Sequence, residues 1–432
     1  MTAPIAPIAS IPSERPTLCA PRRPPCQPEI AAINPRLNRL RHWLPDLAAL
    51  GAALLSAVLA GLLMGSLGGC GGGVGSEGTG SFASGFSQGS ITGFGSIIVN
   101  GVHYDESSAS LADDDGQLLA RSALALGMVV QVSSGAVSTT ADGLSVATAN
   151  SVRAVRALVG PASALEPAAG RLRVLGQPVW LTADSVLSPA FSGGLAGVQA
   201  GQVLEVYGFY DSSRGAYLAT RIGPAPVAAG YRVSGPVASV DGGQSFTLGN
   251  QRFSGVTSGM MAGTQLSLKV QNQPDADGRW VVSAQRSDDR PPDERDGAAL
   301  QGVVSAQGMG GRWVVAGVTV DTAAARITGT LQVGAQVEVR GSLRAGVLLA
   351  SEITVRSAGQ SRDYELKGSI SQLDTVARRF MLRGTPVSYG RAGLVFKNGS
   401  AAQLVGYGGQ LKVKGQLSID RTVLDATEIS FD

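Results

Sequence analysis

The chain has 432 residues, enough for several domains, and its 44% apolar content with only 16% charged residues excludes a disordered polyelectrolyte. Six of the 35 basic and three of the 32 acidic side chains precede Cys70, so the remainder carries 29 of each sign. A body with no net formal charge lacks the basic surface that binds phosphate backbones, and we therefore expect no nucleic-acid partner.

The first 70 residues have the pattern of an export segment. Residues 1–46 are rich in proline and arginine and are expected to be disordered. Residues 47–70 begin with the uncharged run LAALGAALLSAVLAGLLMGSL and end in Leu67-Gly68-Gly69-Cys70. A positive flank, an apolar run and small residues are typical of an export signal.

The ending LGGC resembles the lipobox of bacterial lipoproteins. The resemblance implies that Cys70 is acylated, becomes the mature N-terminus and anchors the protein in the membrane. An aspartate after the lipidated cysteine would keep such a lipoprotein from the outer membrane, but here the residue is Gly71. The resemblance therefore also implies an outer-membrane location, facing the periplasm or the cell surface. The alternative is an uncleaved transmembrane helix, since the 21 apolar residues can span a bilayer. Residues 71–88, mostly glycine and serine, predict a flexible tether.

Two short patterns recur five times in the remaining chain. The first is an opening strand around a glycine, at Gly89, Gly160, Gly235, Gly302 and Gly368. The second is a glycine followed by an alternating strand, at residues 127–132, 201–206, 263–268, 334–339 and 408–413. In the fourth copy, for example, Val337 and Val339 are expected to face a core while Glu338 and Arg340 face water.

These patterns predict an all-β protein of tandem small β-barrels, OB-like, with five or six strands in each. Closed barrels remove exposed sheet edges, and glycines between the strands supply tight turns. A continuous β-solenoid is the alternative, although its coils are usually shorter. The predicted repeats cover residues 89–156, 157–226, 230–286, 298–357 and 363–432, and a charged linker with two prolines occupies 287–297.

The motif GFGSIIVNGVHYD at residues 93–105 resembles the first repeat of a bacterial family of secreted or lipid-anchored proteins. Members are built from a repeated domain of unknown function. The resemblance extends loosely to Asp432 and implies export and β-rich repeats. It implies no activity and no catalytic residues.

The sequence after Cys70 contains few candidates for catalytic or metal-ligating residues. After Cys70 there is no further cysteine and a single histidine, His103, so internal disulfides and thiolate metal sites are excluded and no cofactor or metal is expected. His103 and Asp105 share one face of a predicted strand, opposite Tyr104, and are interpreted as strand residues before a turn. Asp113-Asp114-Asp115-Gly116 lacks the acidic spacing of an EF-hand and is interpreted as a solvated hairpin tip.

The sequence therefore favours a protein without enzymatic activity. Its repeats would serve as a binding or spacer module in the cell envelope, with an envelope protein or a glycan as partner. The alternative is recognition of a carbohydrate or small ligand on an OB-like face, for which Trp180, Tyr207 and Tyr210 are the candidate residues. A glycosidase would need a positioned pair of carboxylates, and no motif indicates one.

Overall fold

The computed structural model describes residues 84–432 except 227–229, 287–290, 293 and 358. All of them belong to one unit, Glu77–Asp432. The expected export segment, Cys70 and most of the expected tether lie outside the described residues.

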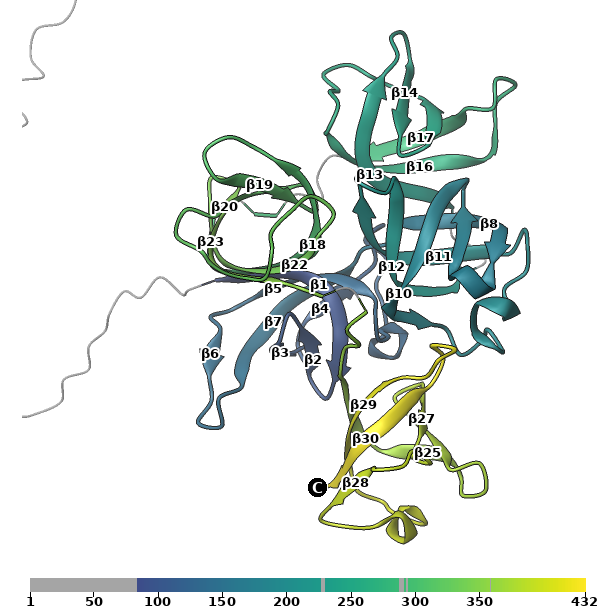
Figure 1. The fold of residues 1–432 in the computed structure, drawn as a ribbon, viewed down its shortest axis with the longest axis vertical. Coiled ribbons are helices and arrows are strands. Elements are labelled where there is room, and N and C mark those ends of the chain that lie inside the picture. Colours follow the sequence, from purple (N-terminus) through teal and green to yellow (C-terminus); the bar gives the residue numbers. More distant parts are fainter. Residues whose placement is uncertain (1–83, 227–229, 287–290, 293, 358) are drawn as a thin grey trace, which may run out of the picture. The chain divides into compact units, whose positions relative to one another are not determined.

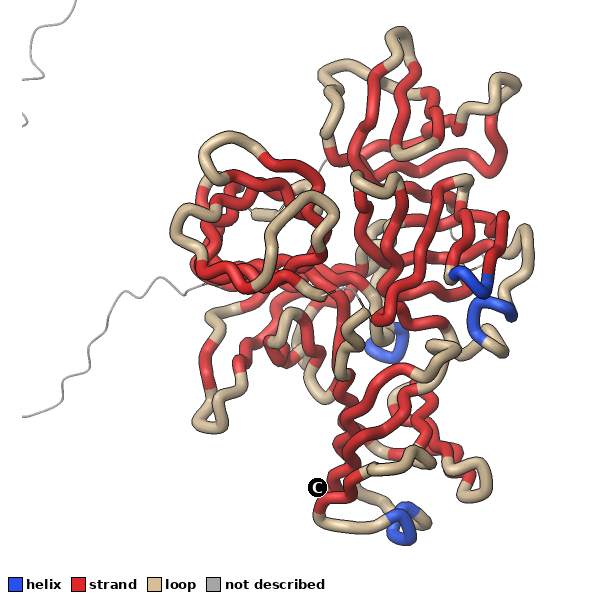
Figure 2. Tube along the Cα trace, in the orientation of Figure 1, coloured by secondary structure: helices blue, strands red, loops and turns tan. Residues whose placement is uncertain are grey.

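The described chain is all-β, as predicted. It forms 30 strands, no α-helix and four short 3₁₀ turns, which Figure 2 shows in blue. Within this part of the chain, no helix has the length and apolarity needed to cross a membrane.

Each repeat forms a small closed ring of five main strands joined in the same order, to which repeats 1, 4 and 5 add short strands. In repeat 2, β8, β9 and β10 form an antiparallel meander, β10 pairs with β12 in parallel, and β11 closes the ring between β12 and β8. These strands are β8 (Leu158–Glu166), β9 (Arg171–Val174), β10 (Gln177–Leu187), β11 (Val203–Asp211) and β12 (Ala216–Pro224). The predicted tandem of OB-like barrels is thus the fold.

The other rings repeat this connectivity. Figure 1 shows the ring of repeat 4 nearly end-on. Repeat 1 contains β1 (Gly85–Phe94), β2 (Ile97–Val99), β3 (Val102–Asp105), β4 (Ser110–Ala112), β5 (Val129–Ser134), β6 (Ser138–Thr139) and β7 (Ser145–Ala154). Repeat 3 contains β13 (Tyr231–Val240), β14 (Ser245–Leu248), β15 (Gln251–Ser254), β16 (Gln265–Pro274) and β17 (Trp280–Arg286).

Repeats 4 and 5 complete the series. Repeat 4 contains β18 (Arg295–Gln307), β19 (Arg312–Val315), β20 (Val318–Asp321), β21 (Arg326–Thr328), β22 (Gln336–Arg344) and β23 (Val347–Val355). In repeat 5 the opening strand is divided into β24 (Tyr364–Gly368) and β25 (Ile370–Asp374). The ring continues through β26 (Arg379–Leu382), β27 (Thr385–Ser388), β28 (Val395–Lys397), β29 (Leu411–Leu417) and β30 (Leu424–Phe431).

The alternation read from the sequence determines which side chains fill the rings. In β22, Val337 and Val339 are buried, whereas Glu338 is half-buried and Arg340 is exposed, as predicted. Because successive side chains of a strand point to opposite faces, one face of β22 closes the core and the other contacts solvent.

A glycine recurs where the fourth and fifth strands of three rings change register. Gly208, Gly341 and Gly415 each stand at such a bulge. A Cβ atom on Gly341 would lie 2.0 Å from the carbonyl oxygen of Leu349, and Gly208 faces the oxygen of Leu218 in the same way. These positions therefore accept only glycine without a shift of the backbone.

The rings are joined to one another by their opening strands. β1 pairs in parallel with β18 over residues 85–88 and with β24 at residues 93–94. β8 pairs with β13 at residues 158–159. Each half of a bent opening strand uses one edge within its own ring, so its other edge is available to a neighbouring ring.

Two predicted boundaries are wrong for this reason. Residues 85–88, assigned to the tether, form the start of β1 between β5 and β18, and residues 295–297, assigned to the linker, begin β18. Gly85 would place a Cβ 2.4 Å from Ser134 Oγ, and Ser87 is fully buried. Small residues here fit a crowded strand, although the same composition is typical of a tether.

The hydrophobic interiors also extend across repeats. One cluster of buried residues combines repeats 1 and 5 and also includes Val186, Tyr207, Phe209 and Leu218 of repeat 2 and Val303 of repeat 4. A second combines repeats 2 and 3, and a third fills repeat 4 together with Phe86 of β1. The interiors of the five barrels are therefore joined into three cores and are not enclosed one by one.

Candidate functional site

A hollow of about 440 Å³ lies where four repeats meet, and we call it the inter-repeat hollow. Its size is within the range of roughly 300–1,000 Å³ typical of small-molecule sites. Its walls come from β1 and β5, from β11 and β12, from β13 and the start of β16, and from β18 and β19 with their adjoining turns. Most of its lining is apolar, with Val129, Val155, Ala157, Pro236, Val237, Val314 and Ala316 among the residues.

An aromatic pair forms one side of this hollow. The rings of Tyr210 and Tyr217 meet edge to face with their centroids 5.1 Å apart. Tyr217 is fully buried and its hydroxyl donates to the carbonyl oxygen of Ser234 at 3.0 Å. Tyr210 is half-buried, and its hydroxyl has no hydrogen-bond partner among the described residues. Burial and the charge of Asp211 raise the pKa of Tyr210, so its hydroxyl remains protonated and can donate as well as accept.

Three glutamine side chains, those of Gln88, Gln131 and Gln265, add neutral polar groups. Gln88 accepts a hydrogen bond from Gln131 Nε2 at 2.9 Å through its Oε1 and keeps its own amide protons available. Gln265 is half-buried, and its amide has no hydrogen-bond partner in the described part of the chain. The described lining contains no carboxylate, histidine or cysteine, and Arg156 is its one basic side chain.

The positive charge of Arg156 is compensated by an acidic loop of repeat 1. We call residues 113–115 with their cationic partners the 113–115 ion cluster. Arg156 donates to Asp114 through Nε at 3.0 Å and to Asp113 at 3.0 Å. Burial alone would lower the pKa of Arg156, but the hydrogen bond and charge of Asp114 outweigh it and raise that pKa. Arg156 therefore stays charged, with its charge compensated.

The same loop also binds repeat 3. Arg232 pairs with Asp114 at 3.1 Å and with Asp115, while Lys269 lies 2.8 Å from Asp115. Burial would raise the pKa of Asp115, but the hydrogen bond from Lys269 and the charge of Arg232 lower it overall. The ion cluster thus connects repeats 1 and 3 with the segment that leads into repeat 2.

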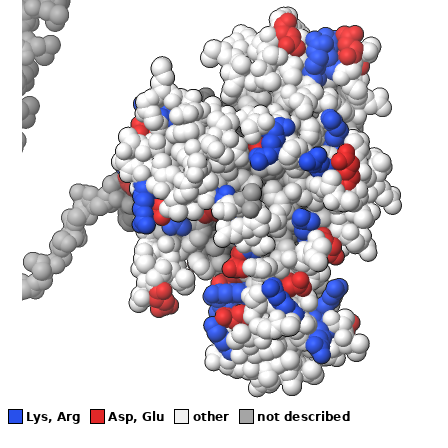
Figure 3. All heavy atoms as spheres, in the orientation of Figure 1, with Lys and Arg blue, Asp and Glu red and all other residues white. Residues whose placement is uncertain are grey.

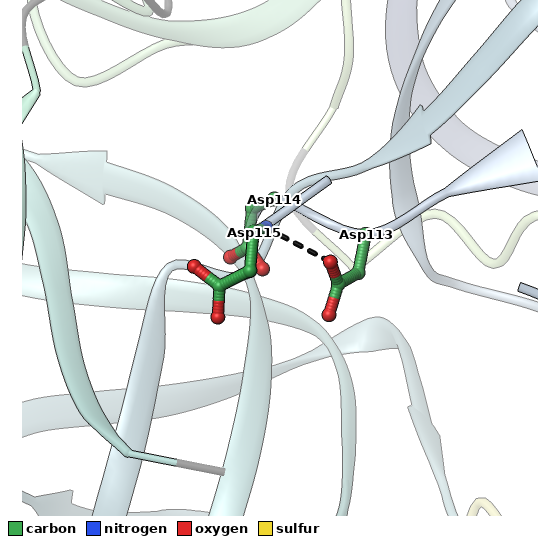
Figure 4. Close-up of side chains that lie close together, drawn as sticks. All are labelled: Asp113, Asp114 and Asp115. Atoms are coloured by element: carbon green, nitrogen blue, oxygen red, sulfur yellow. Dashed lines mark hydrogen bonds between the residues drawn. The ribbon is translucent and has the colours of Figure 1, made fainter. Parts of the chain in front are cut away.

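The prediction of a solvated hairpin tip is therefore wrong for Asp114, which is only 3% exposed. Figure 4 shows the three carboxylates projecting to the same side of the loop, and their ligand atoms lie within 4.8 Å of one another. Such a group can hold a cation, but here the side chains of Arg156, Arg232 and Lys269 already compensate the charge. The cluster is an ion-pair network between repeats. In the space-filling view of Figure 3, basic and acidic side chains likewise lie interspersed over the visible face.

The structure separates the three predicted ligand residues. Tyr210 lines the inter-repeat hollow, whereas Tyr207 is 3% exposed and belongs to the core. Trp180 on β10 is half-buried and lines a second hollow of about 400 Å³ together with Asp184 and Arg356. The guanidinium carbon of Arg171 lies 4.5 Å from the centre of the Trp180 ring.

The His103 region matches its expected interpretation. His103 is half-buried on β3, Tyr104 is buried and Asp105 is exposed, so the faces alternate as predicted. His103 Nδ1 lies 3.4 Å from Ser96 Oγ, and burial lowers its pKa. Asp105 accepts a hydrogen bond from the backbone of Ser107 at 2.9 Å. The two side chains have different partners and do not form an acid–base pair.

Sequence reasoning missed two neighbouring charged side chains in repeat 2, Glu205 and Arg221, which are both half-buried. Burial raises the pKa of Glu205 despite the nearby charges of Arg156 and Arg221. Burial also lowers the pKa of Arg221, whose side chain donates to the carbonyl oxygen of Leu126 at 3.1 Å while its Nε has no partner. Glu205 occupies a polar position in an alternating strand, and such positions are ordinarily interpreted as solvent-facing.

Comparison with known proteins supports the repeat assignment. The model of a family described as a domain of unknown function, DUF5666, matches residues 159–223 and 301–354. The two segments fall in repeats 2 and 4, so the chain contains at least two copies similar to this domain. A search of curated proteins gave no match.

Proposed function

We propose that this chain is a non-enzymatic binding protein of the bacterial cell envelope, anchored by a lipid on Cys70. The inter-repeat hollow is the observation that carries the binding role. Its walls come from four repeats that strand pairing and ion pairs join, so the site is formed only by the assembled body. Preformed concave sites that combine apolar and a few polar groups are typical of small-ligand binding.

The chemistry of the lining supports binding over catalysis. General acid–base chemistry needs a group that titrates near the working pH, and nucleophilic chemistry needs an activated side chain. The described lining contains Tyr210 and Tyr217 with raised pKa values and the fully compensated Arg156. These groups can hold a ligand but have no matched partner for proton transfer.

The export segment supports the location. Lipidation is tested by growing cells with an alkyne analogue of palmitate and measuring the label on the purified protein. We expect labelling of the wild type and of Cys26→Ser, and loss of labelling in Cys70→Ser. Label retained by Cys70→Ser, or a mature protein that still begins at Met1, would contradict the anchor.

Binding is tested separately with the full chain in detergent micelles. The low-molecular-weight fraction of an envelope extract is added, and ligand-observed NMR detects compounds that contact the protein. We expect signals with the wild type that weaken in Tyr210→Ala and persist in Trp180→Ala. Equal signals for the wild type and Tyr210→Ala, or none for either protein, would refute the binding role of the hollow.

A further inference from the structure

We propose that the inter-repeat hollow binds an uncharged saccharide, an inference that rests on the proposed binding function and adds the class of ligand. Three properties of the hollow lead to this class: its charge, its hydrogen-bonding groups and its apolar area. The first excludes ionic ligands, the second excludes purely apolar ligands, and the third favours a ligand with an apolar ring face.

The charge of the lining excludes ionic ligands. Arg156 is the one basic side chain in the described lining, and its guanidinium is bonded to Asp113 and Asp114. The same described lining offers no carboxylate to a cationic ligand. A charged ligand would lose its hydration without gaining a counter-charge, which is costly in a partly enclosed site.

The polar groups suit hydroxyls. The Tyr210 hydroxyl and the Gln265 amide lack hydrogen-bond partners among the described residues, and Gln88 has amide protons to donate. Each of these side chains can donate, and the Tyr210 hydroxyl and Gln265 can also accept. A sugar hydroxyl has the same dual character, so it can satisfy either role. A purely apolar ligand would leave these groups without hydrogen bonds, which carries a penalty.

The apolar area suits the C–H face of a sugar ring. The half-buried ring of Tyr210 is held edge to face by Tyr217, and valines, alanines and Pro236 continue the apolar surface. Aromatic rings fixed in this way offer a large contact area at low conformational-entropy cost. A volume of about 440 Å³ accommodates a ligand of one or a few sugar rings.

The test titrates the full chain, in micelles of a detergent without a sugar headgroup, with defined probes. The neutral probes are maltose, cellobiose and the N-acetylglucosamine disaccharide, and the charged probes are glucuronic acid and glucosamine. Dodecanoate serves as the apolar probe. Isothermal calorimetry gives the dissociation constants. We expect at least one neutral saccharide to bind and the charged sugars and dodecanoate to bind at least about tenfold more weakly.

Variants locate the site. Tyr210→Ala is expected to weaken saccharide binding about tenfold, and Tyr210→Phe, which keeps the ring, about threefold. Trp180→Ala, in the second hollow, is expected to leave the affinity unchanged. A thermal melt of each variant checks that it is folded.

Three results would overturn the inference: no neutral saccharide binds, a charged or apolar probe binds more tightly, or Trp180→Ala and not Tyr210→Ala removes binding. If compounds of the envelope fraction still bind in a way that depends on Tyr210, the proposed binding function stands. Only the assignment of the ligand as an uncharged saccharide is then wrong.

Discussion

Replacing Asp114 by asparagine tests whether the 113–115 ion cluster holds the repeats together. The change keeps the shape of the side chain and removes the charge that faces Arg156 and Arg232. Their side chains are 8% and 4% exposed, so both guanidinium groups would lose a counter-charge in a nearly dry environment. Breaking a buried ion pair from one side costs about 3–5 kcal/mol. Because Asp113 and Asp115 remain, we expect a loss near the lower end, about 3 kcal/mol.

Hydrogen exchange of a backbone amide at the contact between the repeats measures this loss of stability. The amide of Ser234, in β13, donates to the carbonyl oxygen of Ala157 at 2.8 Å, so it reports on the contact between repeat 3 and the segment that enters repeat 2. A loss of about 3 kcal/mol should speed its exchange roughly a hundredfold. The exposed Asp142, in the turn between β6 and β7, gives the control variant Asp142→Asn, which should leave the rate unchanged.

Equal exchange rates at Ser234 in the two variants would show that the cluster contributes nothing to the contact between the repeats. Sodium chloride at about 1 M should change the wild-type rate little, because buried pairs are screened far less than exposed ones. A large effect of salt would mean that the ion pairs are in contact with solvent.

Three further predictions follow from individual residues. Burial raises the pKa of Glu205, so the folded state favours its neutral form; that stabilisation is complete below the unfolded pKa of about 4.5 and is lost as the pH rises through the folded value. In thermal melts, the Tm of Glu205→Gln minus the Tm of the wild type should therefore increase from pH 4 to pH 7. A difference in Tm that stays constant would contradict the raised pKa of Glu205. Gly341→Ala should destabilise the fold by about 1–3 kcal/mol in chemical denaturation, whereas Gly297→Ala, where an added Cβ would meet nothing within 4 Å, should not. The pKa of Asp115 is lowered, so its contribution to stability is present above a pH of about 3.8 and is lost as the pH falls below that value. In thermal melts, the Tm of Asp115→Asn should therefore depend less on pH in that range than the Tm of the wild type. The same dependence of Tm on pH in both proteins would exclude the contribution.

The fold of each repeat could be predicted because strand alternation is a local signal. Val337 and Val339 could be assigned to a core from their spacing alone, and the structure buries both. The joining of the rings was not predictable in the same way. Residues 85–88 have the composition of a tether, and only the distant strand β18 makes them part of a sheet.

The candidate site was predictable in part. Tyr210 was identified as an aromatic residue of a β-barrel, and the structure places it in the inter-repeat hollow. Tyr207, three residues earlier, is also an aromatic residue of this β-barrel, but its side chain faces the core. The burial of Asp114 depends on Arg156, 42 residues away, and on Arg232 in another repeat. No local pattern contains such distant pairings, so a run of three aspartates is interpreted as a solvated turn.

A spectroscopic probe in the inter-repeat hollow shows directly whether a ligand binds there. The chain has eight tyrosines, and fluorotyrosine labelling gives each a ¹⁹F NMR signal, with Tyr210→Phe and Tyr407→Phe used for assignment. On addition of the envelope small-molecule fraction, the Tyr210 signal should shift while that of Tyr407, in repeat 5, stays in place. A Tyr210 signal that does not respond, while another tyrosine shifts, would contradict the assignment of binding to this hollow.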